Sequence, residues 1–137
     1  MTGMGSLPRI TMSRFDHKRI EQLLEMVGER PDLEALREEL DRAELVDPSA
    51  VPSDLVTMNS VVQFVELETG KEWEVALVFP GAADVESNRI SVFAPVGSAL
   101  LGLSIGDSID WPLPQGRTRR LRVVGISYQP EASGDPI

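Results

Sequence analysis

The apolar pattern of this chain changes its period once, and this change limits the possible folds more than any other feature of the sequence. Before residue 48, apolar residues recur at helical spacing, whereas after residue 54 they alternate as in β-strands. The intervening residues 48–55 are rich in proline and serine and are predicted to form a linker. A helical part followed by a strand-rich part predicts an α+β protein.

Residues 13–47 are expected to form an antiparallel helical hairpin. Ser13, with Asp16 three residues later, fits a helix amino-terminal cap; Gly28 fits a helix end, and Pro31 fits the first turn of a second helix. Two matching apolar stripes follow: Ile20, Leu23, Leu24 and Val27 in the first helix, and Leu33, Leu36, Leu40 and Ala43 in the second. With roughly 14 residues in each helix, the hairpin would be about 20 Å long. Residues 1–12 are expected to be a flexible start with a possible short strand.

Residues 56–130 are predicted to form the strand-rich domain, followed by a tail over residues 131–137. The runs 61–67 and 73–79 flank a turn at 68–71 and predict a β-hairpin. A strand at 90–93, a short helix over residues 95–103 opened by Pro95, a turn at Gly106-Asp107 and a second strand form a compact unit. The last predicted strand covers residues 118–128.

Composition excludes several classes of function. The net charge is −9, which disfavours sequence-independent binding to nucleic acid phosphates, and no sequence-specific DNA binding is expected. There is no cysteine, and no apolar run approaches the roughly 20 residues of a membrane span. The first residues do not resemble a secretory signal, so a cytoplasmic location fits. Four arginines, Arg117, Arg119, Arg120 and Arg122, form the only basic cluster, and we expect a solvated sheet edge there rather than an anion site.

Catalytic groups are scarce. His17 is the only histidine, so a catalytic triad would have to be built around it, and a solvated side chain is the simpler expectation. A metal site made of histidine and cysteine is impossible, and there is no phosphate loop, dinucleotide fingerprint or nucleophile elbow. We therefore predict no catalytic residues, metal or cofactor.

Three stretches carry a resemblance to a known family. They read R-I-S-V-F-A-P-V-G-S-A-L-L-G-L-S-I-G-D-S-I-D-W-P-L from Arg89, V-T-M-N-S from Val56 and Y-Q-P-E-A from Tyr128. The first resembles the I-S-x-x-S-P-x-A-R-A-L and G-x-x-x-G-D patterns of the carboxy-terminal domain of the bacterial Gre transcript-cleavage factors. Together with the short hairpin, the chain is similar to the Rnk branch of these proteins. The resemblance implies an FKBP-like twisted antiparallel sheet wrapped on a short helix, preceded by a short coiled coil.

The resemblance also implies a docking surface for RNA polymerase. In Gre factors the matching loop and helix start contact the rim of the polymerase secondary channel, which points here to Ser91, Ala94, Pro95, Val96, Gly97, Ser98 and Asp107. The sequence departs from the Gre pattern at Gly97 and Ser98, where alanine and arginine are usual. The alternative is that this segment only packs under the sheet through Leu100, Leu101 and Leu103, and both can hold for different faces. Asp107 is expected in a tight turn after Gly106. The expectation that its carboxylate also contacts a basic residue of a partner has equal weight.

At the hairpin tip, the resemblance raises a catalytic alternative. Gre factors use two carboxylates at the end of a long coiled coil to help hold Mg²⁺ in the polymerase active centre, and Glu25, Glu29 and Asp32 lie at or near the turn here. The Gre tip pattern G-D-L-S-E-N-A-E-Y has no counterpart at residues 26–36, and a hairpin of about 20 Å is shorter than a cleavage-competent coil. If the tip is not catalytic, its carboxylates only keep the turn soluble and stabilise the start of the second helix.

The expected function is thus a non-enzymatic, monomeric regulator that binds RNA polymerase and competes with Gre-like factors. The alternative is a cleavage factor that uses Glu29 and Asp32. Prolyl isomerisation, which FKBP-like folds also carry out, would need an aromatic pocket, but core packing is the simpler role for Trp73, Phe79, Phe93, Trp111 and Tyr128. The family is associated with control of nucleoside diphosphate kinase, for which we expect an indirect effect on expression.

Overall fold

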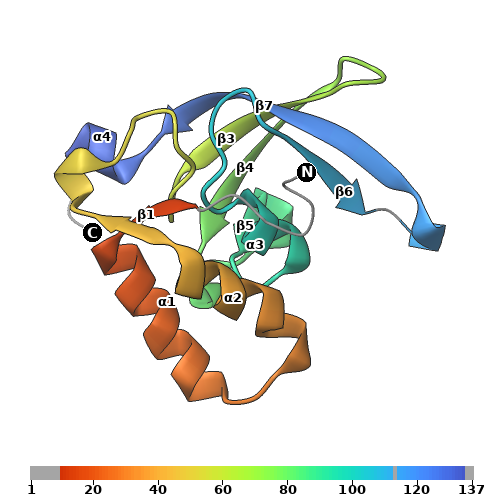
Figure 1. Ribbon diagram of the computed structural model, residues 1–137. Helices are drawn as coiled ribbons and strands as arrows, with labels where there is room; N and C mark the ends of the chain where they lie inside the picture. Colours follow the sequence, from red (N-terminus) through yellow and green to blue (C-terminus); the bar gives the residue numbers. More distant parts are fainter. Residues whose placement is uncertain (1–9, 113, 135–137) are drawn as a thin grey trace, which may run out of the picture.

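The helical part of the chain is a hairpin closed at its base by a small sheet. The computed structural model describes residues 10–112 and 114–134, and nothing below concerns the others. The short strands β1 (Thr11–Ser13) and β2 (Glu44–Val46) pair in parallel on either side of two helices. These helices are α1 (Arg14–Val27) and α2 (Glu34–Arg42), and the 3-10 turn η1 (Pro31–Leu33) leads into α2 (Figure 1).

The ends of α1 follow from identifiable residues. The Ser13 hydroxyl accepts a hydrogen bond from the Asp16 backbone N–H at 3.1 Å, which confirms the predicted cap. Gly28 has a φ of +69°, and its N–H donates to the carbonyl of Leu24. Arg37 of α2 donates to the carbonyls of both Leu24 and Gly28. The second helix therefore helps to cap the first, because the Arg37 guanidinium adds a second bond to the Leu24 carbonyl and also binds the Gly28 carbonyl just past the end of α1.

The second part of the chain is a five-stranded sheet in the order β5-β4-β3-β7-β6. Every neighbouring pair is antiparallel except β4–β5, which is parallel. The short helix α3 (Pro95–Leu100) lies in the hollow of the curled sheet, and α4 (Pro130–Ser133) ends the described chain (Figure 1). The strands are β3 (Val61–Glu66), β4 (Glu72–Val78), β5 (Arg89–Ser91), β6 (Ser108–Pro112) and β7 (Thr118–Tyr128), and the remaining 3-10 turns are η2 (Pro48–Ala50), η3 (Pro80–Ala82), η4 (Val85–Ser87) and η5 (Pro114–Gly116).

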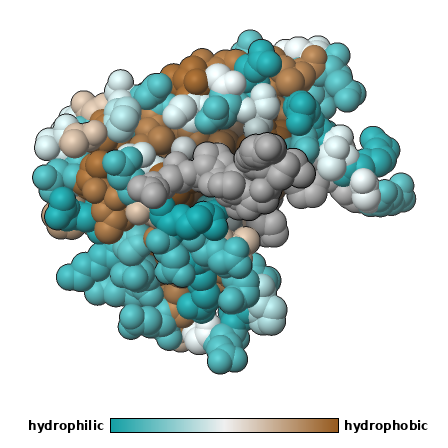
Figure 2. Space-filling view, in the orientation of Figure 1, coloured by the Kyte–Doolittle hydropathy of each residue, from teal (hydrophilic) through white to brown (hydrophobic). Residues whose placement is uncertain are grey.

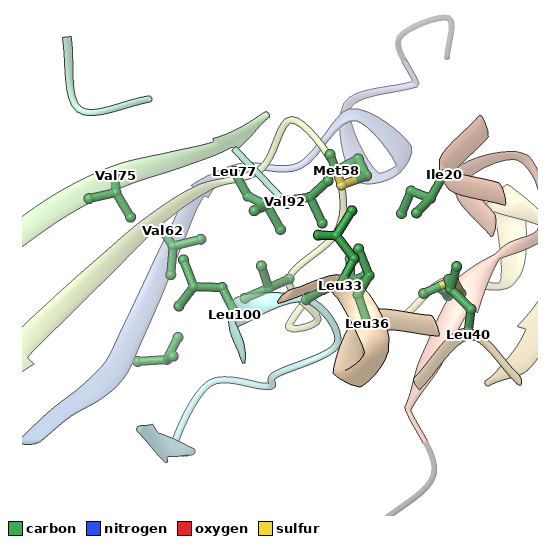
Figure 3. Close-up of a cluster of buried hydrophobic side chains, with 14 of the residues drawn as sticks. Ile20, Leu33, Leu36, Leu40, Met58, Val62, Val75, Leu77, Val92 and Leu100 are labelled. Carbon is green, nitrogen blue, oxygen red and sulfur yellow. The ribbon is translucent and has the colours of Figure 1, made fainter. Parts of the chain in front are cut away.

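One apolar core joins the hairpin to the sheet. Leu33 and Leu36 from the second half of the hairpin are 0% and 1% exposed, and they lie beside Val92 and Leu100 (Figure 3). The inner face of the sheet contributes Val62, Phe64, Leu77, Leu121 and Val123 to the same cluster. The hairpin is therefore joined to the sheet through the buried residues around Leu33 and Leu36.

Several elements differ from those expected from the sequence. The segment after α2 forms β2, which three residues with no alternating pattern did not reveal. The helix expected to reach Leu103 ends at Leu100, and a tail was expected where α4 forms a helical turn. The predicted linker is hydrogen-bonded to the rest of the molecule: the side-chain amide of Gln129, just after β7, donates to the linker carbonyls of Pro52 and Leu55 at 2.8 and 2.7 Å. Residues 1–9 and 135–137 of the predicted start and tail lie outside the described residues.

The prediction that the arginine cluster marks a sheet edge is wrong. It lies on or just before β7, which runs between β3 and β6, so the edges of the sheet are β5 and β6. Arg119 pairs with Glu66 of β3 at 2.9 Å, and Arg120 pairs with Asp110 of β6 at 3.1 Å. These arginines link neighbouring strands, which the sequence did not reveal because strand order is a long-range property.

No helix in the described part of the chain is both long and apolar enough to cross a membrane.

Candidate docking surface and hairpin tip

The segment from Ser91 to Ser98 turns sharply from β5 into α3. The Ser91 hydroxyl accepts a hydrogen bond from the Phe93 N–H at 3.0 Å, and the Ser91 carbonyl accepts one from the Ala94 N–H, also at 3.0 Å. Pro95 then begins α3, where its missing N–H leaves no bond unmade. The resulting turn leaves Ala94 and Val96 half-buried at the start of the helix.

Gly97 and Ser98 face into the structure. A Cβ atom at Gly97 would lie 1.9 Å from the Ser91 carbonyl oxygen and 3.1 Å from the Val92 Cα, so α3 approaches β5 more closely than any side chain allows. The Ser98 hydroxyl donates to the carbonyls of Val92 and Ala94, at 3.0 and 3.1 Å. Both departures from the Gre pattern thus have a local structural role, and Ala94, Val96 and Ser98 are all half-buried.

Asp107 lies in the loop that joins α3 to β6. Its backbone N–H donates to the Ser104 carbonyl at 3.0 Å, while its Oδ2 accepts from the Ser104 N–H at 2.8 Å, so the side chain itself closes the turn. The backbones of Gly106 and Asp107 both bond to Val123 of β7 at 2.8 Å. Asp107 is exposed, so the turn presents a carboxylate whose position is set by the sheet.

The three acidic residues predicted at the hairpin tip are all exposed. Asp32 is 2.7 Å from the guanidinium of Arg30. The hydrogen bond from Arg30, together with its positive charge, holds the pKa of the Asp32 carboxyl below its usual range. Glu25 and Glu29 lie on the hydrophilic outer surface of the hairpin, which forms the lower part of Figure 2.

The structure brings the hairpin turn next to the predicted docking segment. The Arg30 guanidinium lies 5.9 Å from the ring centroid of Phe93, which is within the segment. Leu33, directly after the turn, is fully buried in the core that includes Val92. The tip and the docking segment therefore form one continuous region of the molecule.

Two polar residues at the start of α1 are more buried than the sequence suggested. The expectation that His17 is solvated is wrong: its side chain is 16% exposed, and Nε2 is 3.1 Å from the Leu40 carbonyl at the end of α2. Asp16 is 0% exposed, and its Oδ2 accepts from the Met58 N–H at 3.2 Å. Spacing could have revealed this burial, because Asp16 is four residues before Ile20 and eight before Leu24, on the apolar stripe of α1.

Trp73 and Phe79, two of the described aromatic residues, lie in different surroundings. Lys71 Nζ and Arg119 Cζ lie 4.7 and 4.8 Å from the centroid of the Trp73 ring, and Trp73 helps to line a cavity of about 70 Å³ with Val75, Arg119 and Leu121. Phe79 stacks instead under Arg19 at 4.1 Å. The side chain of Trp111 lies outside the described residues. Among the described residues, no group of three or more histidine, aspartate and glutamate side chains could hold a metal ion.

Comparison with known proteins gives two family matches. Residues 51–128 match the family described as "Transcription elongation factor, GreA/GreB, C-term", and residues 8–46 match "Rnk N-terminus". The "Regulator of nucleoside diphosphate kinase" of Escherichia coli K12 is 46% identical over 132 residues, which cover 95% of this chain and 97% of that protein. "Transcription elongation factor GreA" of Thermodesulfovibrio yellowstonii is 32% identical over 71% of this chain and 61% of its own length.

Solved structures agree with these matches and confirm the α+β fold class. The "Prokaryotic transcription elongation factor GreA/GreB from Nitrosomonas europaea" superposes with a TM-score of 0.80 at 45% identity, over 89% of this chain and all of that one. Gfh1 of Thermus thermophilus, at 24% identity and a TM-score of 0.51 over 88% of this chain and all of its own, shares the fold. The chain therefore belongs to the GreA/GreB family of transcription factors, in the group whose amino-terminal part is of the Rnk type.

Proposed function

We propose that this protein regulates transcription by binding RNA polymerase at the rim of its secondary channel, without catalysing RNA cleavage. In this proposal residues 56–130 form the domain that docks, and residues 13–47 form a hairpin that approaches only the channel mouth. Docking uses the start of α3 around Ala94 and Val96 and the turn at Asp107, and it excludes Gre-like factors by occupying their site. The family membership, and the transcription elongation factors among the relatives, support this assignment.

The observation that carries the proposal is the position of the hairpin turn beside the docking segment. Leu33 and Leu36 are buried in the core that contains Val92, and Arg30 lies against Phe93. A tip held there cannot extend deep into a channel while Ala94 and Val96 contact its rim. The length of α1, 14 residues, adds to this limit, because it corresponds to about 21 Å.

The charge of the protein supports a basic partner surface. The net charge is −9, and the exposed acidic groups include Asp107 and the tip residues Glu25 and Glu29. Such a surface speeds association with a positively charged partner, and salt screens the attraction. Binding to polymerase should therefore weaken as the salt concentration rises.

The alternative function is RNA cleavage assisted by Glu29 and Asp32. Asp32 would first have to leave its ion pair with Arg30. A transcript-cleavage assay on stalled elongation complexes distinguishes the two functions: robust cleavage that is lost in Glu29→Ala or Asp32→Ala would support the alternative.

The name of the Escherichia coli relative suggests a link to nucleoside diphosphate kinase. We place this effect at the level of expression, through transcription, and not in a complex between the two proteins. If a purified kinase co-elutes with this protein in gel filtration, a direct complex replaces this explanation.

We further propose that the protein acts in the cytoplasm as a monomer and does not bind specific DNA sequences. The same gel-filtration runs measure its oligomeric state.

The docking surface is tested by Ala94→Glu, compared with Ala35→Glu on α2 as a matched control. Ala94 is half-buried at the helix start, while Ala35 is exposed on the hairpin. We expect Ala94→Glu to weaken binding to core polymerase by at least tenfold, because an acidic side chain sterically blocks close approach. Ala35→Glu should bind as the unmodified protein does. Equal binding by both variants would place the docking surface elsewhere.

A further inference from the structure

The V-T-M-N-S segment forms a buried turn between the linker and β3. The Ser60 N–H donates to the Thr57 carbonyl at 3.1 Å, and the Thr57 N–H donates to the Ser60 hydroxyl at 2.9 Å. Asn59 has a φ of +67°, and its N–H donates to the Leu77 carbonyl of β4. The turn is thus fixed to the sheet and presents the Met58 N–H and the Thr57 hydroxyl to its surroundings.

Two carboxyl groups from opposite ends of the chain hold this turn. Asp16 of α1 accepts the Met58 N–H through Oδ2 at 3.2 Å. Glu131 of α4 accepts the Thr57 hydroxyl through Oε1 at 2.8 Å. The base of the hairpin and the last helical turn of the described chain are therefore fastened to the same four residues.

Each of these carboxyl groups has a second oxygen that is buried and unused. Oδ1 of Asp16 and Oε2 of Glu131 are inaccessible to solvent and have no hydrogen-bond partner. A buried carboxylate oxygen without a donor is costly, whereas a protonated carboxyl supplies its own donor. Protonation of Asp16 would remove its buried negative charge and turn one of its oxygens into an O–H donor.

The electrostatic surroundings favour this proton at Asp16. Burial raises the pKa of Asp16 from 3.8 to about 7; the charge of Glu131 adds to the rise, and the Met58 N–H and Arg19 oppose it. Glu131 and Arg19 are the only charged side chains that act on Asp16 among the described groups. Neither β1 nor the residues 57–60 contain a titratable side chain.

We propose that Asp16 and Glu131 form a pH-sensitive latch, in which protonated Asp16 fastens the helical hairpin to the sheet and ionised Asp16 is repelled by Glu131 and loosens it. This inference concerns the attachment of the hairpin and does not depend on polymerase binding. Loosening would release the start of α1 and β1 from the V-T-M-N-S turn, because the bond to Met58 is the polar link between them.

The direction of the pH dependence follows from the raised pKa. Below about pH 4 the carboxyl is protonated whether the hairpin is attached or released, so attachment is strongest there. Between about pH 4 and pH 7 only the attached state binds the proton, so attachment weakens as the pH rises. Above about pH 7 both states are ionised and the dependence ends.

Two measurements on the full chain test the latch. A ¹³C NMR titration of side-chain carboxyls should show Asp16 titrating near pH 7, and a midpoint near 4 would overturn the proposal. Hydrogen exchange of the Met58 amide, corrected for its intrinsic pH dependence, should show opening that increases up to about tenfold per pH unit between pH 5 and 7. Opening that is independent of pH over this range would equally contradict it.

Three variants separate the latch from general effects of charge. Asp16→Asn keeps the acceptor for the Met58 N–H and cannot ionise, so exchange at Met58 should lose its excess pH dependence. Glu131→Gln removes the like charge and should lower the Asp16 midpoint; an unchanged midpoint would exclude Glu131 from the latch. Asp32→Asn, at the exposed tip, is the matched control and should leave both readouts as in the unmodified protein. If Asp16→Asn does not fold, the carboxyl titrations of the unmodified protein and of Glu131→Gln still test the latch.

Discussion

At the scale of single residues, Gly97 and Ser98 explain why this chain departs from the Gre pattern. The two positions are where α3 contacts the backbone at the end of β5 and in the turn that follows it. Gly97 lies against Ser91 because it has no side chain, and the Ser98 hydroxyl donates to the carbonyls of Val92 and Ala94. The family resemblance placed both residues on a partner-facing surface. The geometry gives both residues a structural role beneath the proposed docking surface, where we assign the contacts with a partner to Ala94, Val96 and Asp107.

Gly97→Ala should destabilise the protein by about 2 kcal/mol or more, because the new Cβ would overlap the Ser91 carbonyl and α3 would have to move away from β5. Urea denaturation monitored by circular dichroism measures this. Gly81→Ala is the matched control: no atom lies within 4 Å of a Cβ there, and the stability should change by less than about 0.5 kcal/mol. Equal stability of the two variants would show that α3 can shift freely.

The Asp107 carboxylate closes a turn and carries a negative charge, and these two properties can be tested separately. Asp107→Asn keeps an oxygen that can accept from the Ser104 N–H, so the melting temperature should stay within about 2 °C. Loss of the carboxylate should weaken polymerase binding about threefold to tenfold at low salt, and less at high salt. A binding titration at two salt concentrations measures this. Binding that is equal to that of the unmodified protein at low salt would remove Asp107 from the docking surface.

At the scale of secondary structure, the sequence predicted elements with a strong local period and missed those held by distant partners. β7 is found over the predicted residues 118–128, and the β3–β4 hairpin flanks the predicted turn. β2 was missed because its three residues are held by pairing with β1, more than 30 positions away. The arginine cluster was misplaced at an edge for the same reason: nothing local in Thr118–Tyr128 reveals that β6 will pair with it.

The buried residues of α2, Leu36 and Leu40, should contribute most to the stability of the hairpin. Leu36 is 1% exposed within the shared core, so Leu36→Ala should lower the free energy of unfolding by about 2–5 kcal/mol. Leu45→Ala is the matched control, because Leu45 is 43% exposed on β2 and should contribute less than about 1 kcal/mol. Chemical denaturation of both variants measures the difference. If Leu36→Ala were as mild as Leu45→Ala, the hairpin would not be packed on the sheet in solution.

At the scale of the whole molecule, the single core makes the hairpin and the sheet one folding unit. Residues of α1, α2, α3 and the sheet strands β3, β4 and β7 belong to the same buried cluster. The sequence indicated a helical part and a strand-rich part but not this union, because the stripes of the hairpin could equally have faced only each other. The shared core also brings the two parts of the candidate site together. The sequence located the predicted docking segment and the tip separately, and only the fold shows that Arg30 and Phe93 lie together.

Unfolding should therefore occur in one transition. Far-UV circular dichroism reports mainly on α1 and α2, whereas the fluorescence of Trp73 reports on strand β4 of the sheet. The two signals should give coincident urea transitions. Loss of helical signal at a clearly lower urea concentration would show that the hairpin is an independent unit.

The proposed function requires the chain to occupy the polymerase site of Gre factors without sharing their activity. A competition titration tests this directly: a labelled Gre factor is bound to stalled elongation complexes, this protein is added, and displacement and transcript cleavage are followed in the same samples. We expect the label to be displaced and cleavage to fall in proportion, with no cleavage by this protein alone. Cleavage that persists at full displacement, or a Gre factor that stays bound at saturating concentrations of this protein, would contradict the proposed function.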